Sequence, residues 1–361
     1  MRKERNDVFK NKYIIQVIMK TLRLALLGFG NAGKAFAKIL NDKHEEIKDT
    51  MGCDVVVTGI VTGTRGALYN PEGLDLKSAW TEIEETGTFS KDNPYFSTMN
   101  SIEMAENGEY DAIVEMTPLQ IFTGEPAATH LRIAMGRGKH AITANKGPIA
   151  WYYKELKELA EKNGVKFYYE TTVMDGTPIF NLKDETLMFA TVTQVEGILN
   201  TTTNYVLEEL AKGKNYDDVI EEGKRIGFVE ADPSMDIEGW DASAKITALL
   251  NVLMDAGINP KDVERKGIED ITIEDIRAAE NRGNVIKLMC RGTIEDGKVK
   301  ASVKPEEVEK GSLMSVIDGT SSVVQITTDL MGTLTIIEHD PDLVQTGYGV
   351  FSDVVRIVRN A

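Results

Sequence analysis

Apolar residues in the first half of the chain gather into short continuous runs, and stretches of helical periodicity separate these runs. The length and apolar character of the runs are typical of strands buried in a parallel sheet. Five such strands are expected, at residues 22–28, 54–61, 111–118, 140–146 and 165–170. Helices are expected after residue 33, over 124–138 and over 148–163. This alternation predicts an α/β domain over about residues 20–165.

The regular alternation ends near Glu170, and strands and helices then follow one another in a mixed order. Strands are expected at residues 190–199, 284–293, 298–303 and 322–329. Helices are expected near residues 202–212, 216–226, 240–256 and 346–358. The mixture predicts an α+β domain over 166–339 with a mostly antiparallel sheet. No long Gly, Ser or Pro linker separates the halves, so we expect two closely coupled domains around one cleft.

Charge and cysteine content narrow the class of protein. The 361 residues suffice for about two domains, and the net charge of −16 argues against nucleic acid or an anionic membrane as a partner. Cys53 and Cys290 form neither a disulfide framework nor a metal-binding spacing, which favours a reducing cytoplasm. The four histidines are scattered, so no catalytic transition metal is expected.

The N-terminal segment does not have the pattern of an export signal. Its apolar part, residues 13–19, is short, contains Gln16 and lacks a small-residue cleavage site. No apolar run approaches the roughly 18 residues that a membrane span requires. Initiation at Met19 would leave residues 1–18 as an extension.

A glycine motif follows the first predicted strand. Gly28, Gly30 and Gly33 stand in the pattern GxGxxG between this strand and a helix, with Asn31 inside the motif. In a dinucleotide site the first glycine permits a tight turn and the second lets the pyrophosphate approach the backbone. The third allows close packing of helix and strand. The motif therefore predicts a nicotinamide dinucleotide site.

The end of the second predicted strand bears on the choice of cofactor. NAD-specific sites usually carry an acid there, which binds the ribose 2′-hydroxyl. Residues 62–66 contain no acid and one arginine, Arg65. Arg65 is suited to a 2′-phosphate, so NADP is favoured and NAD remains an alternative. A surface arginine in a loop would give the same sequence.

An acidic stretch, residues 227–245, holds five carboxylates and a single cation, Lys245. Asp241 and Lys245 are four residues apart on a predicted helix, so their side chains share one face. A solvated helix start would also favour acids at this place. A second lysine, Lys146, ends the strand predicted at 140–146, at the sheet edge where α/β proteins bind ligands.

Four separated motifs together resemble the homoserine dehydrogenase family, in its short archaeal form without a regulatory domain. They are Thr143 to Lys146, Glu170 with residues 172–180, residues 197–205, and the spacing of Glu230, Asp241 and Lys245. The resemblance implies a Rossmann-like dinucleotide-binding domain and an α+β domain for substrate binding and dimerisation, with residues 340–361 returning to the first. It also implies a homodimer and the reversible NAD(P)H-dependent reduction of L-aspartate 4-semialdehyde to L-homoserine, a step in threonine and methionine biosynthesis.

The resemblance also implies roles for individual residues. Lys245 would transfer the proton, Lys146 would orient the substrate and assist, and Asp241 would hold both substrate and lysine. Glu230 and Asp236 would bind the substrate ammonium group, and Thr202 would contact the substrate. Cofactor contacts are expected from Gly28, Gly30, Asn31, Gly33, Arg65, Thr117, Thr143, Asn145 and Thr346. A monovalent cation site is implied at Glu170, Val173, Asp175 and Thr177, largely through backbone carbonyls.

Several positions depart from the family pattern. Thr201 replaces a glycine, Phe228 stands where a tyrosine is common, and Asp175 adds a charge where a small residue is frequent. Residues 338–349 replace a glycine-rich loop, although Thr346 keeps its place. Two alternatives therefore stay open. One is a related dehydrogenase of another small amino-acid aldehyde or hydroxy acid, and the other is a catalytically silent nucleotide-binding regulator.

Overall fold

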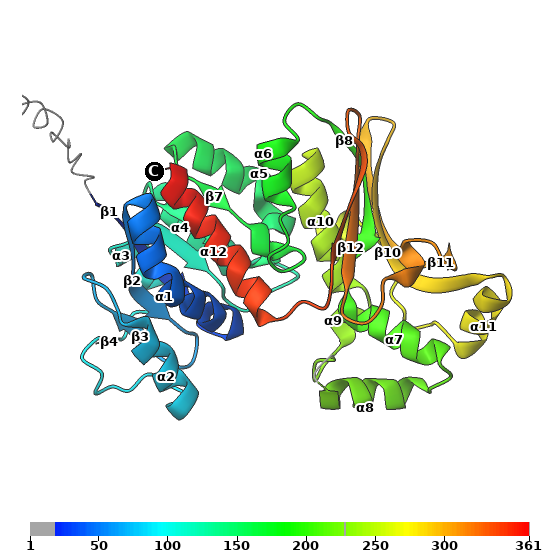
Figure 1. Cartoon of the computed structure of the whole chain (residues 1–361), viewed down its shortest axis with the longest axis horizontal. Helices are drawn as coiled ribbons and strands as arrows, with labels where there is room; N and C mark the ends of the chain where they lie inside the picture. Colours follow the sequence, from blue (N-terminus) through cyan, green and yellow to red (C-terminus); the bar gives the residue numbers. More distant parts are fainter. Residues whose placement is uncertain (1–18, 227–228, 361) are drawn as a thin grey trace, which may run out of the picture.

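The first sheet has seven strands in the order β4-β3-β2-β1-β5-β6-β7 in the computed structural model, which describes residues 19–226 and 229–360 (Figure 1). Its five parallel strands are β1 (Lys20–Leu27), β2 (Cys53–Val61), β5 (Ala112–Glu115), β6 (His140–Thr143) and β7 (Phe167–Tyr168). The short strands β3 (Ala67–Tyr69) and β4 (Phe96–Ser97) extend the sheet antiparallel at one edge. The predicted α/β fold of this half is confirmed.

Six helices accompany this sheet. They are α1 (Asn31–Met51), α2 (Leu76–Thr86), α3 (Ser101–Asn107), α4 (Ala127–Gly136), α5 (Lys146–Asn163) and the C-terminal α12 (Leu343–Asn360). Figure 1 shows α12 lying along α1. The contact is close, because a Cβ at Gly347 would lie 2.8 Å from the backbone of Ala35. The last helix thus returns to the first sheet.

Three predicted strands are shorter than expected. β5 ends at Glu115 because the Glu115 carboxylate accepts the Thr117 N–H at 3.0 Å, which turns the chain. β6 ends at Thr143 because Asn145 caps α5 by accepting the Gly147 N–H. The strand expected over 165–170 is reduced to β7, and Glu170 begins a 3₁₀ turn, η1 (Glu170–Thr172). After β5 and β6 a local side-chain hydrogen bond therefore replaces the last strand residues.

The second sheet has six strands in the order β13-β12-β8-β10-β11-β9. They are β8 (Val192–Ile198), β9 (Glu264–Arg265), β10 (Asn284–Glu295), β11 (Lys298–Glu309), β12 (Ser322–Thr328) and β13 (Gly332–Glu338). All neighbouring pairs are antiparallel except β11 and β9. The predicted mostly antiparallel α+β domain is confirmed.

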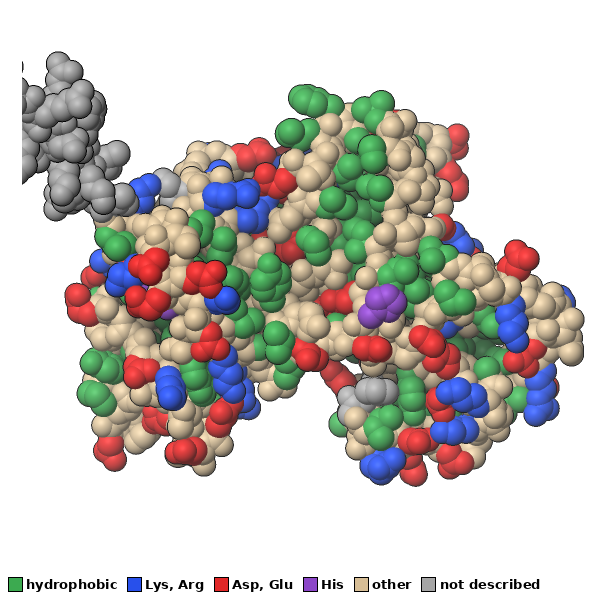
Figure 2. All heavy atoms as spheres, in the orientation of Figure 1, with side chains coloured by type: hydrophobic (Ala, Val, Ile, Leu, Met, Phe, Trp, Pro, Cys, Tyr) green, Lys and Arg blue, Asp and Glu red, His purple; other side chains and the backbone are tan. Residues whose placement is uncertain are grey.

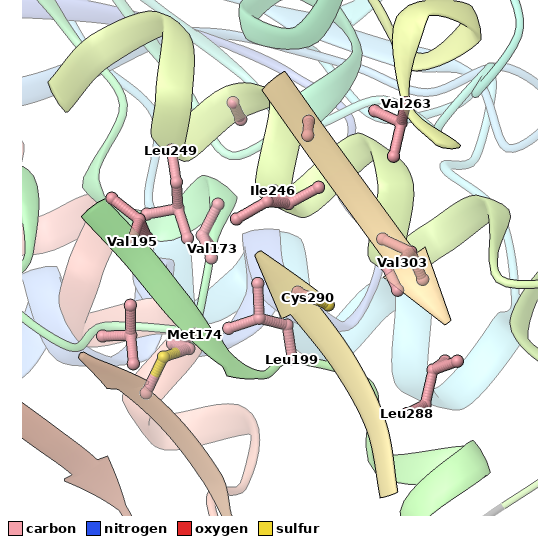
Figure 3. Close-up of a cluster of buried hydrophobic side chains, with 14 of the residues drawn as sticks. Val173, Met174, Val195, Leu199, Ile246, Leu249, Val263, Leu288, Cys290 and Val303 are labelled. Atoms are coloured by element: carbon pink, nitrogen blue, oxygen red, sulfur yellow. The ribbon is translucent and has the colours of Figure 1, made fainter. Parts of the chain in front are cut away.

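The helices of this domain are α6 (Phe180–Thr186), α7 (Thr201–Ala211), α8 (Tyr216–Ile226), α9 (Ser234–Ile237), α10 (Trp240–Met254) and α11 (Ile273–Asn281). The apolar face of α10 packs on the sheet, and Figure 3 shows Ile246 and Leu249 over Val195, Cys290 and Val303. These five side chains are completely buried. Truncation of a buried isoleucine to alanine typically costs about 2–5 kcal/mol, so this core fixes α10 firmly.

The two domains meet where α5 lies against α10. The side-chain amide of Asn251 on α10 donates to the carbonyl of Ile149 on α5 at 3.2 Å and to the carbonyl of Ile258 at 2.9 Å. Figure 1 shows α5 and α10 together between the two sheets. The first turn of α5 is therefore held against the last turn of α10.

Candidate functional site

The glycine turn after β1 has the geometry that a dinucleotide site requires. Gly28 has φ +96°, and a Cβ there would collide with the carbonyl oxygen of Met116. A Cβ at Gly33 would lie 2.9 Å from the carbonyl oxygen of Gly28. Gly30, the N-cap of α1, has open space around its Cβ position, and no side chain caps the helix, which begins at Asn31. The exposed N–H groups at this helix start are suited to a pyrophosphate.

A pair of alanine substitutions separates folding from binding at this turn. Gly28→Ala is expected to destabilise the protein by about 3 kcal/mol, because the new Cβ meets both a forbidden φ and a backbone oxygen. Gly30→Ala is expected to change stability by less than about 0.5 kcal/mol but to weaken cofactor binding. Urea unfolding and cofactor titration measure the two effects. Equal destabilisation by both variants would contradict this assignment.

A buried acid, Glu115, organises the polar residues at the edge of the first sheet. Its carboxylate accepts the hydroxyl protons of Thr117 and, at 3.1 Å, Thr143. The Thr143 hydroxyl accepts the N–H of Asn145 at 3.0 Å, and the Asn145 side-chain amide donates to the Thr117 carbonyl at 3.2 Å. Three predicted cofactor contacts thus form one network. Sequence reasoning missed Glu115, whose signal is an acid ending an apolar strand.

Arg65 lies where the sequence placed it, in the turn after β2. Its backbone N–H donates to the Thr62 hydroxyl at 2.8 Å, and its carbonyl accepts the Phe89 N–H at 2.8 Å. The side chain is exposed. The backbone of Arg65 is therefore fixed while its side chain is exposed to solvent.

Lys146 and Lys245 come together on one carboxylate. The Nζ atom of Lys146, the first residue of α5, lies 3.1 Å from Asp241 Oδ1. The Nζ atom of Lys245 lies 3.0 Å from Asp241 Oδ2 and donates to the Leu199 carbonyl at 2.8 Å. All three side chains are at least three-quarters shielded from solvent. The solvated helix start that the sequence left open is therefore excluded.

The charges of this triad depend on one another. Burial alone would raise the pKa of Asp241, but the two lysines outweigh it and hold that pKa well below its usual range. Burial acts to lower the pKa of Lys245, and the neighbouring Asp241 outweighs it, so the net shift is upward. At neutral pH the centre therefore contains an ionised aspartate and a protonated Lys245.

Asp236 stands beside this triad and is held by two neighbours. Its carboxylate accepts the side-chain amide of Asn200 at 2.7 Å and the hydroxyl of Thr202 at 3.0 Å. Asn200 also donates to Asp241 at 2.9 Å and caps α7 by accepting the Thr203 N–H. Burial and the charge of Asp241 raise the pKa of Asp236. The sequence assigned no role to Asn200, which links the two carboxylates.

Glu230 does not join this cluster. It lies in the segment before α9 with an exposed side chain, and no polar contact joins it to Asp236 or Asp241 within the part of the chain that the structure describes. Phe228 lies outside the described residues. Thr201, the first residue of α7, is half-buried next to Thr202.

The four residues expected to bind a monovalent cation lie along one segment, and both carboxylates among them already accept hydrogen bonds from the protein. The Glu170 carboxylate accepts the N–H groups of Ile179, Phe180 and Asn181 at 2.6–2.8 Å and so caps α6. Asp175 accepts the Thr346 hydroxyl at 2.6 Å. Val173 and Thr177 are buried. Among the described residues, no group of three or more His, Cys, Asp or Glu side chains is arranged to hold a metal.

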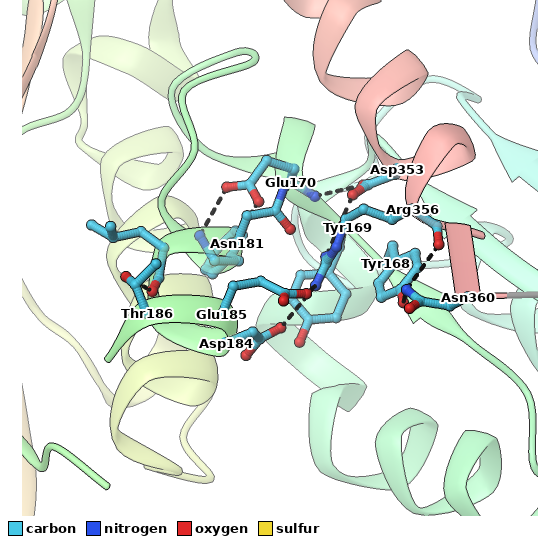
Figure 4. Close-up of polar contacts among 12 residues, drawn as sticks. Tyr168, Tyr169, Glu170, Asn181, Asp184, Glu185, Thr186, Asp353, Arg356 and Asn360 are labelled. Atoms are coloured by element: carbon cyan, nitrogen blue, oxygen red, sulfur yellow. Dashed lines mark hydrogen bonds and ion pairs between the residues drawn. The ribbon is translucent and has the colours of Figure 1, made fainter. Parts of the chain in front are cut away.

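Glu170 also connects α12 to the substrate side of the molecule. Figure 4 shows Asp353 of α12 directed at the backbone of Glu170, whose N–H it accepts at 2.9 Å. In the same view Arg356 points to Asp184 and Glu185 of α6. Burial raises the pKa of Glu170 to about 7 despite three N–H donors. These contacts fix the path of the chain between the domains.

Comparisons with known proteins match this chain to one family. A family model described as homoserine dehydrogenase matches residues 178–355, and one described as its NAD binding domain matches residues 28–170. A homoserine dehydrogenase of Methanocaldococcus jannaschii is 38% identical over 335 residues, which cover 92% of this chain and 98% of that protein. An NAD(+)-dependent homoserine dehydrogenase of Pseudomonas canavaninivorans is 33% identical over 345 residues, which cover 95% and 98%.

Solved structures give the same result. A putative homoserine dehydrogenase from Archaeoglobus fulgidus superposes with a TM-score of 0.82 at 29% identity, covering 93% of this chain and 99% of that one. A hyperthermophilic archaeal homoserine dehydrogenase in complex with NADPH superposes with a TM-score of 0.80 at 28% identity, covering 94% and 98%.

Proposed function

This chain belongs to the homoserine dehydrogenase family and is thus an NAD(P)-dependent oxidoreductase, and we propose that Lys245 and Lys146 are its catalytic residues. The reaction is the interconversion of L-aspartate 4-semialdehyde and L-homoserine. The observation that supports these roles is the convergence of both lysines on Asp241. The matches to the two family models and to the relatives confirm the resemblance to this family that the sequence motifs indicated. The roles of individual residues remain our proposal.

The chemistry needs a proton donor close to the substrate oxygen. When bound, the nicotinamide cofactor supplies the hydride to the aldehyde carbon or accepts it from the alcohol. Lys245, kept protonated by Asp241, donates a proton from Nζ to the substrate oxygen during reduction and takes it back during oxidation. Lys146 holds the same oxygen from the opposite helix, and Asp241 keeps both ammonium groups in place.

Substrate recognition requires an acidic partner for the α-ammonium group. Asp236, fixed by Asn200 and Thr202, presents a carboxylate beside the lysine pair. Thr202 contacts the substrate from the start of α7. Glu230 would join the ammonium contact by movement of its own segment, because its side chain is exposed in this structure.

The direct test is oxidation of NADPH and of NADH by the purified protein with L-aspartate 4-semialdehyde. Rapid oxidation with formation of homoserine supports the proposal. Binding of cofactor without oxidation would overturn it. In that case the protein should be tested with other small amino-acid aldehydes and hydroxy acids. Turnover of one of these would show a different substrate, and Thr201, which stands next to Thr202, would be the first residue to examine for that change of specificity.

We further propose that Arg65 favours NADP over NAD by pairing with the 2′-phosphate. Arg65→Ala is expected to raise the KM for NADPH roughly tenfold and to leave that for NADH within about twofold, because a charge-assisted pair with phosphate is typically worth about 1.5–3 kcal/mol. Steady-state kinetics with both cofactors measures the ratio. An exposed lysine on α2, Lys77→Ala, serves as the control. Equal changes with both cofactors would refute the role of Arg65.

We propose that the protein forms a homodimer through the second sheet. At the end of this sheet Met188, Phe189, Leu330 and Met331 are exposed, Phe189 by 96%. Backbone and side-chain hydrogen bonds between Thr191 and Asp329 bring the two segments together, and Figure 2 shows apolar side chains gathered there. Exposed apolar clusters of this kind commonly mark interfaces.

Disruption of this surface is expected to change the mass of the particle in solution. Light scattering coupled to size exclusion should give a dimer for the wild type and for the control Tyr216→Ser on α8. Phe189→Asp should shift the equilibrium to monomer, because it would place a charge where the proposed interface buries an apolar side chain. A monomeric wild type would contradict the proposal.

Three further assignments complete the proposal. The dinucleotide-binding domain comprises residues 20–165 with 340–361, and the substrate-binding and dimerisation domain comprises 166–339. None of the helices formed by residues 19–226 and 229–360 is long and apolar enough to cross a membrane. We place the enzyme in the cytoplasm, in keeping with two buried, unpaired cysteines.

A further inference from the structure

Glu115, the last residue of β5, is a completely buried acid in the nucleotide-binding half of the molecule. The Nδ1 atom of the buried His130 on α4 lies 3.7 Å from Glu115 Oε1, and its Nε2 atom lies 2.9 Å from the Ser101 hydroxyl. A carboxylate away from water is costly unless its oxygens accept hydrogen bonds. The groups that donate to Glu115 therefore show what this acid holds in place.

One oxygen of Glu115 fixes the loop after β5. Its Oε1 atom accepts the Thr117 N–H at 3.0 Å and also the Thr117 hydroxyl. Between them, the Met116 N–H donates to the Leu27 carbonyl at 2.6 Å. The Met116 carbonyl lies so close to Gly28 that a Cβ there would collide with it. The loop after β5 is thus held against the glycine turn of the dinucleotide site.

The other oxygen of Glu115 fixes the start of α5. Its Oε2 atom accepts the Thr143 hydroxyl at 3.1 Å, and that hydroxyl accepts the Asn145 N–H at 3.0 Å. Asn145 in turn caps α5, whose first residue is Lys146. The Nζ atom of Lys146 lies 3.1 Å from Asp241. A short series of contacts therefore joins Glu115 to the lysine pair.

A further hydrogen bond ties the two loops to each other. The Asn145 side-chain amide donates to the Thr117 carbonyl at 3.2 Å. Thr143 is completely buried, so its hydroxyl serves this network. With Glu115 on one side and the amide of Asn145 on the other, the loop after β5 and the start of α5 keep one fixed relation.

We propose that Glu115 is a positioning residue, which sets the distance between the nicotinamide ring and the substrate. The ring would be held by the loops after β5 and β6, and the substrate by Lys146, with Thr143 as the link from Glu115 to α5. This inference rests on the proposed function. Hydride transfer requires close contact of the reacting atoms, and a misplacement of about 1 Å can cost about 100-fold in rate.

The test uses Glu115→Gln, which keeps the shape of the side chain but replaces an accepting oxygen with a donating NH2 group, so one donor of the network loses its acceptor. A single turnover of bound NADPH with L-aspartate 4-semialdehyde is followed by stopped flow. Its amplitude reports the fraction of active enzyme, and its rate constant reports the transfer. The rate constant should fall about 10- to 100-fold at unchanged amplitude.

Thr58→Val is the matched structural control. Thr58 is buried on β2 of the same sheet, and its hydroxyl donates to the Glu109 carbonyl at 2.8 Å. This variant should lower the melting temperature and leave the rate constant within about twofold of the wild type. A lower amplitude with an unchanged rate constant in Glu115→Gln would show a merely structural role and overturn the proposal.

A double-mutant cycle tests the link through Thr143. Thr143→Val keeps the shape of the residue and should reproduce the slow transfer, also if Glu115→Gln does not fold. The double variant should be no slower than the slower single variant, because both changes break the same series of contacts. Rate losses that multiply would overturn the proposed link.

Failure of the proposed function is a separate result. It would appear as NADPH binding by the wild type without turnover of L-aspartate 4-semialdehyde. The dissociation constant for NADPH would then still test Glu115. We expect Glu115→Gln to raise it about tenfold and Thr58→Val to leave it unchanged, since only the first disturbs the loop after β5. An unchanged constant in both variants would overturn the inference.

Discussion

Replacement of Lys245 by methionine is expected to abolish turnover and to leave cofactor binding nearly unchanged. Methionine keeps much of the length and apolar volume of the lysine side chain but donates no proton. General acid catalysis contributes about 100- to 10,000-fold to such reactions, so kcat should fall by that factor. The cofactor contacts assigned to Gly30 and Asn31 lie on α1, so the dissociation constant for NADPH should stay within about twofold.

Two further lysine variants make this result specific. Lys146→Met should lower kcat less and raise the KM for the aldehyde, because Lys146 orients the substrate and assists the transfer. Lys298→Met, on the exposed hairpin between β10 and β11, should behave as the wild type. Turnover by Lys245→Met at a rate close to that of the wild type would remove Lys245 from the mechanism.

The second large effect concerns Asp241→Asn, which removes the charge between the two lysines. Burial acts to lower the pKa of Lys245, and Asp241 is the strongest influence that raises it. Without that charge, burial and the nearby Lys146 act together, and the pKa of Lys245 falls. Breaking a buried ion pair by removing one partner also typically costs about 3–5 kcal/mol of stability.

The sign of the pH effect follows directly. Reduction needs protonated Lys245, so its rate falls as pH rises through the pKa of that lysine. In Asp241→Asn the fall should therefore occur at a lower pH than in the wild type. The pH dependence of kcat for aldehyde reduction measures this shift, and thermal unfolding measures the lost stability. An unchanged alkaline limit would show that Asp241 does not set the charge of Lys245.

The order of the elements could be predicted from the sequence because the apolar pattern is strong in this chain. Buried parallel strands such as β1 and β2 are continuous apolar runs, and α10 has clear helical spacing. The expected elements did not include the strands β3, β4, β9 and β13 or the helices α2, α3, α6, α9 and α11. The strands β3 and β4 are three and two residues long and too short to show a period. The pattern also predicted β5 and β6 to be longer than they are. Side-chain hydrogen bonds end these strands, and an apolar pattern does not reveal such contacts.

The candidate site was only partly accessible from the sequence. The proximity of Asp241 and Lys245 follows from helical spacing alone. The approach of Lys146 does not, because it depends on the packing of α5 against α10, and only the family resemblance indicated it. Glu115 and Asn200 act through tertiary hydrogen bonds and gave no pattern that periodicity reveals.

The central claim is that this site transfers hydride between a nicotinamide and the carbonyl carbon of L-aspartate 4-semialdehyde. The most direct measurement uses NADPH that carries deuterium on the transferred position of its ring, with mass spectrometry of the product. The account predicts homoserine that contains one deuterium, on the carbon that bears the hydroxyl group. Unlabelled homoserine, or loss of NADPH without homoserine, would contradict it.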